Sequence, residues 1–142
     1  MSDTSAPPPG GTPIPTTIGF NVFVGPIYQF DDEGDTSRFG FVAETRHMNS
    51  AGAVHGGMLM TIADVAMTRT ARASVGGRRC TTVSLNCDFI AAAKEGETVM
   101  ARVRITRRTR SLVFLTTDVM AGDRLALSAT GIWKILDVEP AQ

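Results

Sequence analysis

Residues 56–77, GGMLMTIADVAMTRTARASVGG, carry a helical pattern that decides how the rest of the chain is interpreted. Small and apolar residues such as Leu59, Ile62 and Ala66 recur at steps of three and four, the spacing of one helix face. A glycine pair at 76–77 ends the pattern, as glycines commonly end helices. Because most of the circumference is apolar, the segment predicts a helix that other elements wrap around.

Four segments dense in Val, Ile, Leu, Phe and Thr follow this helix and predict strands. They are RCTTVSLNCDFI at 79–90, ETVMARVRITRR at 97–108, SLVFLTTDVM at 111–120 and RLALSATGIWKIL at 124–136. The links between them are short, which predicts that consecutive strands are antiparallel neighbours. The expected fold class is therefore α+β, with a curled antiparallel β-sheet wrapped around one long central helix.

The chain before the helix has shorter patterns. FGFVAETR at 39–46 alternates apolar and polar residues and predicts a strand, followed by a loop at 47–54. IGFNVFVGPIYQF at 18–30 predicts two short strands, or a strand and a turn, before the polar loop DDEGDTS. Residues 1–17 are rich in Pro, Gly, Ser and Thr, a composition that cannot offset its ordering entropy. We therefore expect a flexible tail over 1–17 and a single domain over 18–142.

Size and charge limit the classes of function. With 142 residues, 43% of them hydrophobic, the chain can bury one sizeable core. The formal net charge is +0, so no overall basic field exists to gather nucleic acid or an anionic membrane. The N-terminus has no signal-peptide pattern, and no apolar run reaches the roughly 18 residues that span a bilayer. These features predict a cytoplasmic protein that binds neither nucleic acid nor membrane.

Asp64 is the helix residue that packing explains least. It lies about two turns into the helix, too far to cap it or to gain much from the helix dipole. Its neighbours on the same stripe, Met60 and Met67, are apolar, and a carboxylate is costly there unless it is paired or used. Two interpretations stay open: a hydrogen bond or ion pair with a following element, or a catalytic carboxylate.

Backbone donors and a polar loop precede this acid. Gly56 and Gly57 begin the helix, and without side chains they let a ligand approach N–H groups at the positive end of the helix dipole. His55 directly before them fits a ring that fixes the turn by hydrogen bonding, so we assign it a shaping role. Asn49 taken alone fits a turn residue that bonds its own backbone.

As a set, these residues supply what hydrolysis of an activated acyl group needs. They offer a carboxylate to activate water, backbone donors for a developing oxyanion and an amide to orient a reactant. The sequence has no G-x-S-x-G motif, no cysteine near a histidine, and no histidine and carboxylate spacing typical of a metal site. We therefore expect hydrolysis that needs no metal, no cofactor and no Ser or Cys nucleophile.

Asn49, VHGGMLMTIAD at 54–64 and TTVSLNCDFIAAAKEGE at 81–97 follow one another in the order and approximate spacing of a known family. Over about residues 39–136 the chain resembles the hot-dog fold acyl-CoA thioesterases, in particular their phenylacetate-pathway, PaaI-like branch. The resemblance implies a hot-dog domain that hydrolyses the CoA thioester of an aryl or medium-chain acyl group, with CoA as part of the substrate. One departure is AAA at 91–93, where members of the family frequently carry a proline.

The resemblance also implies roles for individual residues. Asp64 corresponds to the acid that acts as general base or nucleophile, and Gly56 to the residue whose amide polarises the thioester carbonyl. Asn49 corresponds to the loop residue that places substrate or water. His55 and Gly57 are expected beside the bound substrate.

Two further positions follow from the same comparison and from side-chain chemistry. Thr82 corresponds to a Ser or Thr on the strand after the helix that assists the water, and Thr81 and Ser84 are close enough in sequence to take that role instead. Met60, with its neighbouring methionines, predicts an adaptable apolar wall for the acyl group.

Three arginines, Arg107, Arg108 and Arg110, gather in the segment RRTRS. Arginine binds phosphate with planar, bidentate donors, so these residues are candidates for holding the nucleotide end of CoA. The alternative is a solvated turn whose charges keep sheet edges apart.

The helix length bears on assembly. Nine residues of helix separate His55 from Asp64 by about 13 Å, which one chain can hardly close around a single substrate. We therefore expect a homodimer, or a dimer of such dimers, in which Asn49 and Gly56 of one protomer face Asp64 of the other, as the resemblance also implies. Two other functions stay open: a non-catalytic module that binds acyl-CoA, and an enoyl-CoA hydratase, which typically has an Asp–His pair near the helix start.

Overall fold

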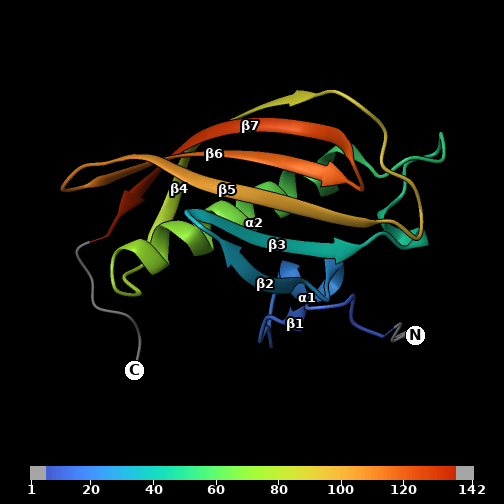
Figure 1. The fold of residues 1–142 in the computed structure, drawn as a ribbon, viewed down its shortest axis with the longest axis horizontal. Coiled ribbons are helices and arrows are strands. Elements are labelled where there is room, and N and C mark those ends of the chain that lie inside the picture. Colours follow the sequence, from blue (N-terminus) through green and yellow to red (C-terminus); the bar gives the residue numbers. More distant parts are fainter. Residues whose placement is uncertain (1–5, 137–142) are drawn as a thin grey trace.

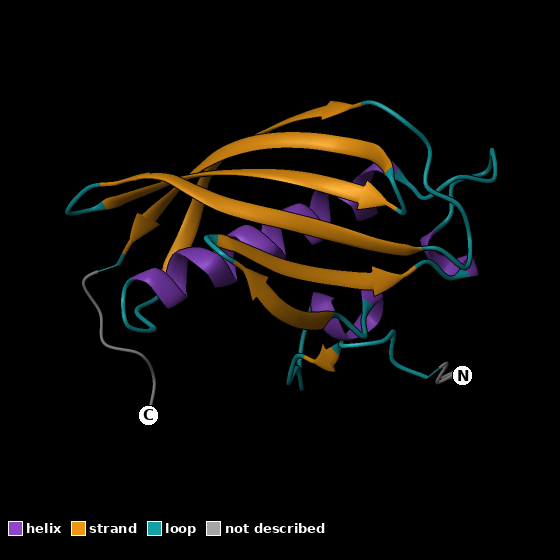
Figure 2. Ribbon diagram, viewed as in Figure 1, coloured by secondary structure: helices purple, strands orange, loops and turns teal. Residues whose placement is uncertain are grey.

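A helix of 19 residues, α2 (Gly56–Ser74), lies inside the curve of a seven-stranded antiparallel sheet (Figure 1). The computed structural model describes residues 6–136 of the chain. In chain order the elements are β1 (Thr12–Pro13), α1 (Phe20–Val24), β2 (Tyr28–Glu33), β3 (Thr36–Val42), the 3-10 turn η1 (Thr45–His47), α2, β4 (Cys80–Phe89), β5 (Thr98–Arg108), β6 (Leu112–Ala121) and β7 (Arg124–Ile135). The α+β class and the sheet wrapped around a central helix are confirmed (Figure 2).

The core forms where α2 meets the concave face of the sheet. Ile62 and Met67 on the helix are fully buried, as are Phe41, Leu115 and Trp133 from three different strands. The indole Nε1 of Trp133 donates a hydrogen bond of 2.8 Å to Thr68 Oγ1, which fixes the helix against β7. The helix predicted from the three- and four-residue steps therefore has the buried position that its apolar circumference requires.

The order of the strands differs from the one that the short links predict. The sheet runs β1-β2-β3-β5-β6-β7-β4, so β4 pairs with β7 and not with β5. Three strand spacings, about 14 Å, separate β4 from β5, and an extended link of eight residues can reach about 26 Å. The link at 90–97 is therefore long enough to pass the ends of β6 and β7, and the expectation of direct neighbours was wrong at this step.

The segment before β3 also differs from prediction. Residues 20–24 form the short helix α1, where strands were expected, and β2 extends through Asp31–Glu33, which were expected to be loop. Phe20 and Phe23 are 62% and 75% exposed. The preference of aromatic residues for strands depends on packing against a sheet. Phe20 and Phe23 make no such packing in the core, so their β-propensity does not decide the structure of this segment.

Part of the segment expected to be a flexible tail is attached to the sheet. Thr12 and Pro13 pair with Gln29 and Tyr28, and the N–H of Ile14 donates to Ile27 O at 2.8 Å. This pairing gives residues 12–14 partners that composition cannot reveal. Residues 1–5 of the expected tail lie outside the described residues, and the division of the chain at residue 17 stays a prediction.

Cys80 and Cys87 on β4 are free thiols that are partly buried. Among the helices between residues 6 and 136, none combines the length and hydrophobicity that crossing a bilayer needs.

Candidate active site

The loop before α2 is held by a buried histidine. The Nδ1 atom of His47 accepts a hydrogen bond from the N–H of Glu44 at 2.9 Å, so Nε2 carries the proton and donates to Val24 O at 2.7 Å. Burial lowers the pKa of His47, which favours this neutral ring. The carbonyl of His47 also accepts from the N–H of His55 at 2.8 Å. The residue thus ties the loop to both α1 and the helix start, a role that the sequence did not single out.

Asn49 forms the turn that its sequence context predicts. Its Oδ1 accepts from the N–H groups of Ala51 and Ala53 at 2.9 and 3.0 Å. Its side-chain nitrogen has no hydrogen-bond partner within the described residues. The residue is exposed and lines a cavity of about 310 Å³ together with Gly56 and Phe89. The carbonyl of Asn49 is therefore occupied by the turn, while the amide N–H₂ is available to a ligand.

The start of α2 presents a backbone donor at the same cavity. His55 is the N-cap, and its Nδ1 accepts from the N–H of Gly57 at 2.8 Å, which confirms the predicted shaping of the turn. The N–H of Gly56 makes no hydrogen bond within residues 6–136. A Cβ added to Gly56 would lie 3.1 Å from the ring of Phe89. Glycine at position 56 therefore leaves the backbone N–H open to a ligand beside the ring of Phe89. The predicted contacts of His55 and Gly57 with substrate stay predictions.

Asp64 meets β4 through one short hydrogen bond. Thr82 Oγ1 donates to Asp64 Oδ1 at 2.6 Å. Thr82 lies at a β-bulge: Thr82 faces Trp133, Ser84 faces Ile132, and Val83 between them is extra. Of the three hydroxyls considered from the sequence, the one on Thr82 is placed at the acid. In the described part of the chain, Asp64 Oδ2 has no hydrogen-bond partner.

The acid borders a cavity of its own. Asp64 is partly buried and lines a space of about 200 Å³ between α2 and the N-terminal segment, with Val65, Ile14 and Ile27 on its walls. The cavity beside Asn49 and Gly56 is a separate one. One chain therefore brings the candidate residues together as two pairs, Asn49 with Gly56 and Asp64 with Thr82, and does not join the pairs.

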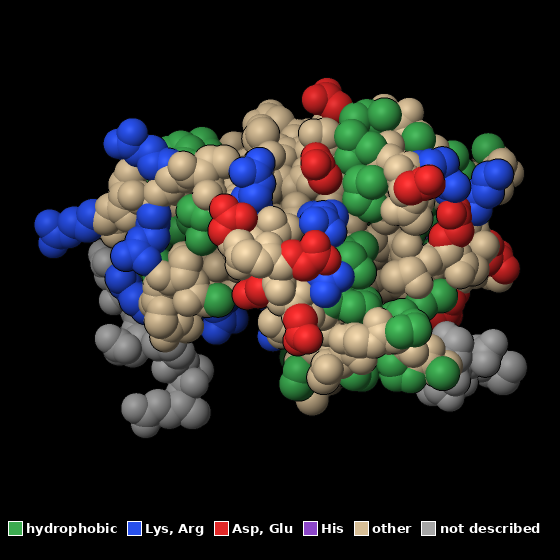
Figure 3. All heavy atoms as spheres, viewed as in Figure 1, with side chains coloured by type: hydrophobic (Ala, Val, Ile, Leu, Met, Phe, Trp, Pro, Cys, Tyr) green, Lys and Arg blue, Asp and Glu red, His purple; other side chains and the backbone are tan. Residues whose placement is uncertain are grey.

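The three arginines of the β5–β6 turn divide into two kinds. All three are exposed, but Arg108 Nη1 donates to the carbonyl of Ser74 at the end of α2, whereas the side chains of Arg107 and Arg110 make no hydrogen bond within residues 6–136. Lys and Arg side chains gather at this end of the molecule, on the left of the view in Figure 3. Met60, proposed as part of an acyl wall, is 37% exposed on the first turns of α2.

Metal-ligating side chains do not gather at the site. Within residues 6–136, no three His, Cys, Asp or Glu side chains lie close enough together to hold a metal ion. The chemistry available at Asp64 and Gly56 is that of a carboxylate, a hydroxyl and backbone donors.

A curled antiparallel sheet wrapped around one long helix defines the class of fold, the hot-dog fold. Residues 51–127 match the thioesterase superfamily, and the chain belongs to that family.

Individual relatives agree with this assignment. A Pseudomonas aeruginosa protein named "Putative esterase PA0474" is 26% identical over 129 residues, which cover 90% of this chain and 96% of that protein. Mouse acyl-coenzyme A thioesterase 13 is 28% identical over 76 residues, and the match covers 54% of each protein. The structure of the E. coli PaaI protein from the phenylacetic acid degradation operon is similar in fold, with a TM-score of 0.71, 15% identity and coverage of 78% of this chain and 79% of that one.

Proposed function

We propose that this chain hydrolyses acyl-CoA thioesters to a free acid and CoA at a site that two protomers complete. The observation that carries the proposal is the hydrogen bond of 2.6 Å between Thr82 and Asp64, because it fixes a carboxylate at the rim of a cavity while leaving its second oxygen available. The name of the mouse relative, an acyl-coenzyme A thioesterase, supports CoA as the thiol.

The thioester carbonyl is polarised at the start of α2. Its oxygen accepts the N–H of Gly56, which lies at the positive end of the helix dipole and has no other partner in the described chain. The side-chain N–H₂ of Asn49, in the same cavity, helps to place the substrate. The same interactions strengthen as negative charge develops on the oxygen during attack.

Asp64 of the facing protomer supplies the base. Its carboxylate takes a proton from water, the water oxygen attacks the carbonyl carbon, and the C–S bond breaks as the tetrahedral intermediate collapses. The proton passes to the departing CoA sulfur, so that acid and thiol are released and the carboxylate is restored. Direct attack by Asp64, followed by hydrolysis of the anhydride, gives the same products. Thr82 holds the carboxylate in one orientation for either route.

The outer edge of β4 is where a second protomer would fit. Among the described strands, β4 pairs only with β7, which leaves ten residues with one open edge. Val83, Phe89 and Ile90 along and after this strand are 58%, 55% and 55% exposed. A long, open, apolar edge strand is normally covered. Pairing along β4 would bring Gly56, beside Phe89, and Asp64, beside Thr82, toward their counterparts in the partner.

Mixing inactive chains tests the composite site. Asn49→Ala and Asp64→Ala chains are unfolded, mixed in equal amounts and refolded together. Random pairing gives roughly half heterodimers, each with one intact site, and hence about a quarter of wild-type activity. Either chain refolded alone is the control. A mixture without activity would show that each site is built within one chain.

The reaction itself is tested with a panel of substrates. Steady-state release of CoA is measured for aryl-CoA and medium-chain acyl-CoA thioesters, and hydration is measured for enoyl-CoA. Thiol release that is lost in Asp64→Asn is the expected result. Binding of acyl-CoA without turnover would identify a binding module instead, and hydration without thiol release would identify a hydratase.

The nucleotide end of CoA is assigned to the β5–β6 turn. Arg107 and Arg110 are exposed there and can reach phosphates, while Arg108 contacts Ser74 O and has fewer free donors. Met60, 37% exposed, lies outside the cavity that Asp64 lines, and its contact with the acyl group stays a prediction.

A further inference from the structure

Arg69 on α2 is a charged residue without a counter-ion in the part of the chain that the structure describes. It is partly buried, and within residues 6–136 it makes no hydrogen bond or ion pair. Burial, together with the positive charge of Arg72 one turn later, lowers the pKa of Arg69. Arg102 and Arg124, by contrast, contact Glu33 at 3.1 Å and Glu97 at 2.5 Å. A guanidinium that is partly removed from water and lacks a carboxylate is costly unless a ligand supplies one.

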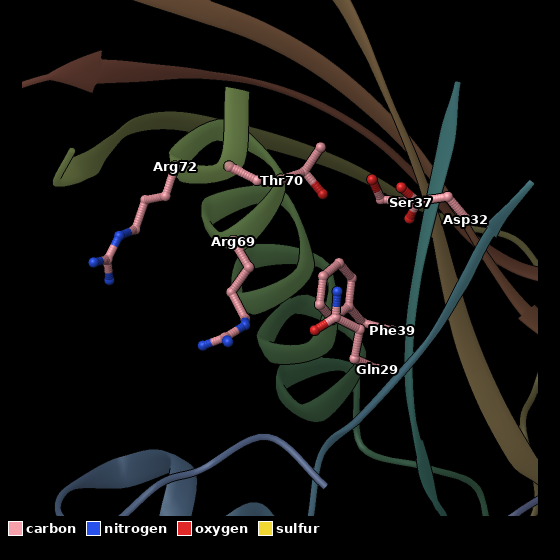
Figure 4. A pocket seen from close by; sticks show the side chains of 8 residues that line it. Gln29, Asp32, Ser37, Phe39, Arg69, Thr70 and Arg72 are labelled. Carbon is pink, nitrogen blue, oxygen red and sulfur yellow. The ribbon is translucent and has the colours of Figure 1, made fainter. Parts of the chain in front are cut away.

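Arg69 and Arg72 border the cavity that holds Asp64. They line the space of about 200 Å³ described above and also a neighbouring cavity of about 360 Å³, whose opposite wall includes Asp32. Figure 4 shows both guanidinium groups on the same side of α2, away from Asp32. The single polar contact of Arg72 in the described chain is a hydrogen bond of 3.4 Å to Gly77 O. Two cationic groups therefore line the cavity that Asp64 borders, and most of their N–H donors have no partner within residues 6–136.

Helix geometry sets the distance between these cations and the reacting group. Five residues separate Asp64 from Arg69 and eight separate it from Arg72, which correspond to about 7.5 and 12 Å along the axis. The apolar side chains of Val65 and Ile27 line the space between. A short acyl chain with an anionic end has the matching length and polarity.

We propose that Arg69, assisted by Arg72, binds a carboxylate at the far end of the acyl group, so that the preferred substrates are CoA thioesters of short dicarboxylic acids. The planar donors of Arg69 pair with the carboxylate in bidentate fashion. The negative charge of Asp64 at the opposite end of the cavity repels that carboxylate and so sets the direction in which the acyl group lies. This inference rests on the proposed thioesterase activity and names the substrate class for it.

The test compares two acyl groups of equal chain length that differ in the terminal carboxylate. Values of kcat/KM are measured for glutaryl-CoA and valeryl-CoA with the wild type, Arg69→Gln and the control Arg104→Gln, which removes an exposed arginine of β5. The wild type is expected to prefer glutaryl-CoA by about 10- to 100-fold, the range of one charge-assisted bidentate contact. Arg69→Gln should lose this preference with valeryl-CoA turnover kept within about three-fold, and Arg104→Gln should change neither value.

Other outcomes overturn the proposal. If the wild type shows no preference for glutaryl-CoA, the acyl carboxylate is not the ligand of Arg69. The same conclusion follows if Arg69→Gln lowers kcat/KM equally for both thioesters. If Arg69→Gln lowers kcat/KM for both CoA thioesters but not for the corresponding acyl-pantetheine thioesters, the anion that Arg69 binds is a CoA phosphate instead. Circular dichroism shows whether the fold is intact, and Arg69→Lys, which keeps the charge but not the planar donors, should retain part of the preference for glutaryl-CoA.

A calorimetric measurement keeps this inference separate from the proposed function. Dissociation constants for glutaryl-CoA and valeryl-CoA are measured with the Asp64→Asn variant, with and without Arg69→Gln. Tighter binding of glutaryl-CoA that depends on Arg69 supports the site even if the wild type hydrolyses no thioester. Equal binding of the two thioesters overturns the site even if the wild type hydrolyses both.

Discussion

The start and the middle of α2 contribute to the candidate site in different ways. At the start the reactive group is a backbone N–H, on Gly56, and the side-chain acceptors around it are already engaged: His55 caps Gly57, and Asn49 Oδ1 accepts from two amides of its own turn. In the middle the reactive group is the side chain of Asp64, and its neighbour Thr82 comes from a strand 18 residues further along the chain.

This contrast shows which interactions make each half of the site. The helix start is built from hydrogen bonds within a few residues, so its shape follows from local turn chemistry. The middle depends on β4 lying over α2 with the correct register, which is a long-range contact. Substitutions that separate backbone from side-chain contributions therefore test the two halves independently.

Replacing the acid should have the largest effect. Asp64→Asn keeps the shape of the side chain and removes the base, so kcat is expected to fall by about 10²- to 10⁴-fold while acyl-CoA binding stays within several-fold. Steady-state kinetics and calorimetry measure the two quantities. Circular dichroism checks the fold, and a folded variant with near wild-type kcat would contradict the role of Asp64.

Removal of the backbone donor is expected to have the next largest effect. Gly56→Pro deletes the N–H at the first helical position, where proline is favoured, and His55 already has the extended conformation, with φ −58° and ψ 137°, that precedes a proline. Loss of one oxyanion donor should lower kcat by about 10²- to 10³-fold.

Gly56→Ala is the matched control for that change. It adds a Cβ near the exposed ring of Phe89 but keeps the N–H, so kcat should stay within about five-fold of the wild type. Equal losses in the alanine and proline variants would show that crowding, and not the missing donor, is responsible.

The hydrogen bond that orients the acid should matter less than either reactive group. Thr82→Val removes the hydroxyl with little change in volume, and kcat is expected to fall by about ten-fold, as for loss of one hydrogen bond to a charged group. Thr82→Ser keeps the donor and should retain most of the activity. If valine and serine gave the same rate, the contact of 2.6 Å would have no part in catalysis.

The smallest effect is expected far from both halves. Arg107 and Arg110, replaced together by Ala, should raise KM for CoA thioesters by about three- to ten-fold and leave KM for a truncated thioester without the nucleotide unchanged. Arg108→Ala should instead lower the melting temperature by about 3 °C, since its guanidinium donates to Ser74 O. A solvated turn would leave both values of KM unchanged.

Much of the fold could be predicted from local patterns. The apolar spacing of α2, the glycines that begin and end it and the four β-rich segments after it are properties of neighbouring residues, and all five elements form where they were expected. The unusual position of Asp64 and the shaping of the turn by His55 were visible for the same reason, because periodicity and capping act over one or two turns.

Tertiary contacts decided the remainder. Thr82 was the predicted partner of the acid, with Thr81 and Ser84 as alternatives, and only the packing of β4 over α2 shows that Thr82 contacts Asp64. The position of β4 beside β7, the helix α1 in a β-rich segment and the partial burial of Arg69 with no counter-ion among residues 6–136 likewise depend on residues far apart in the chain. Pattern fixes which face of an element is apolar, whereas strand order, register and the pairing of charges are set by which elements meet, and that information is not local.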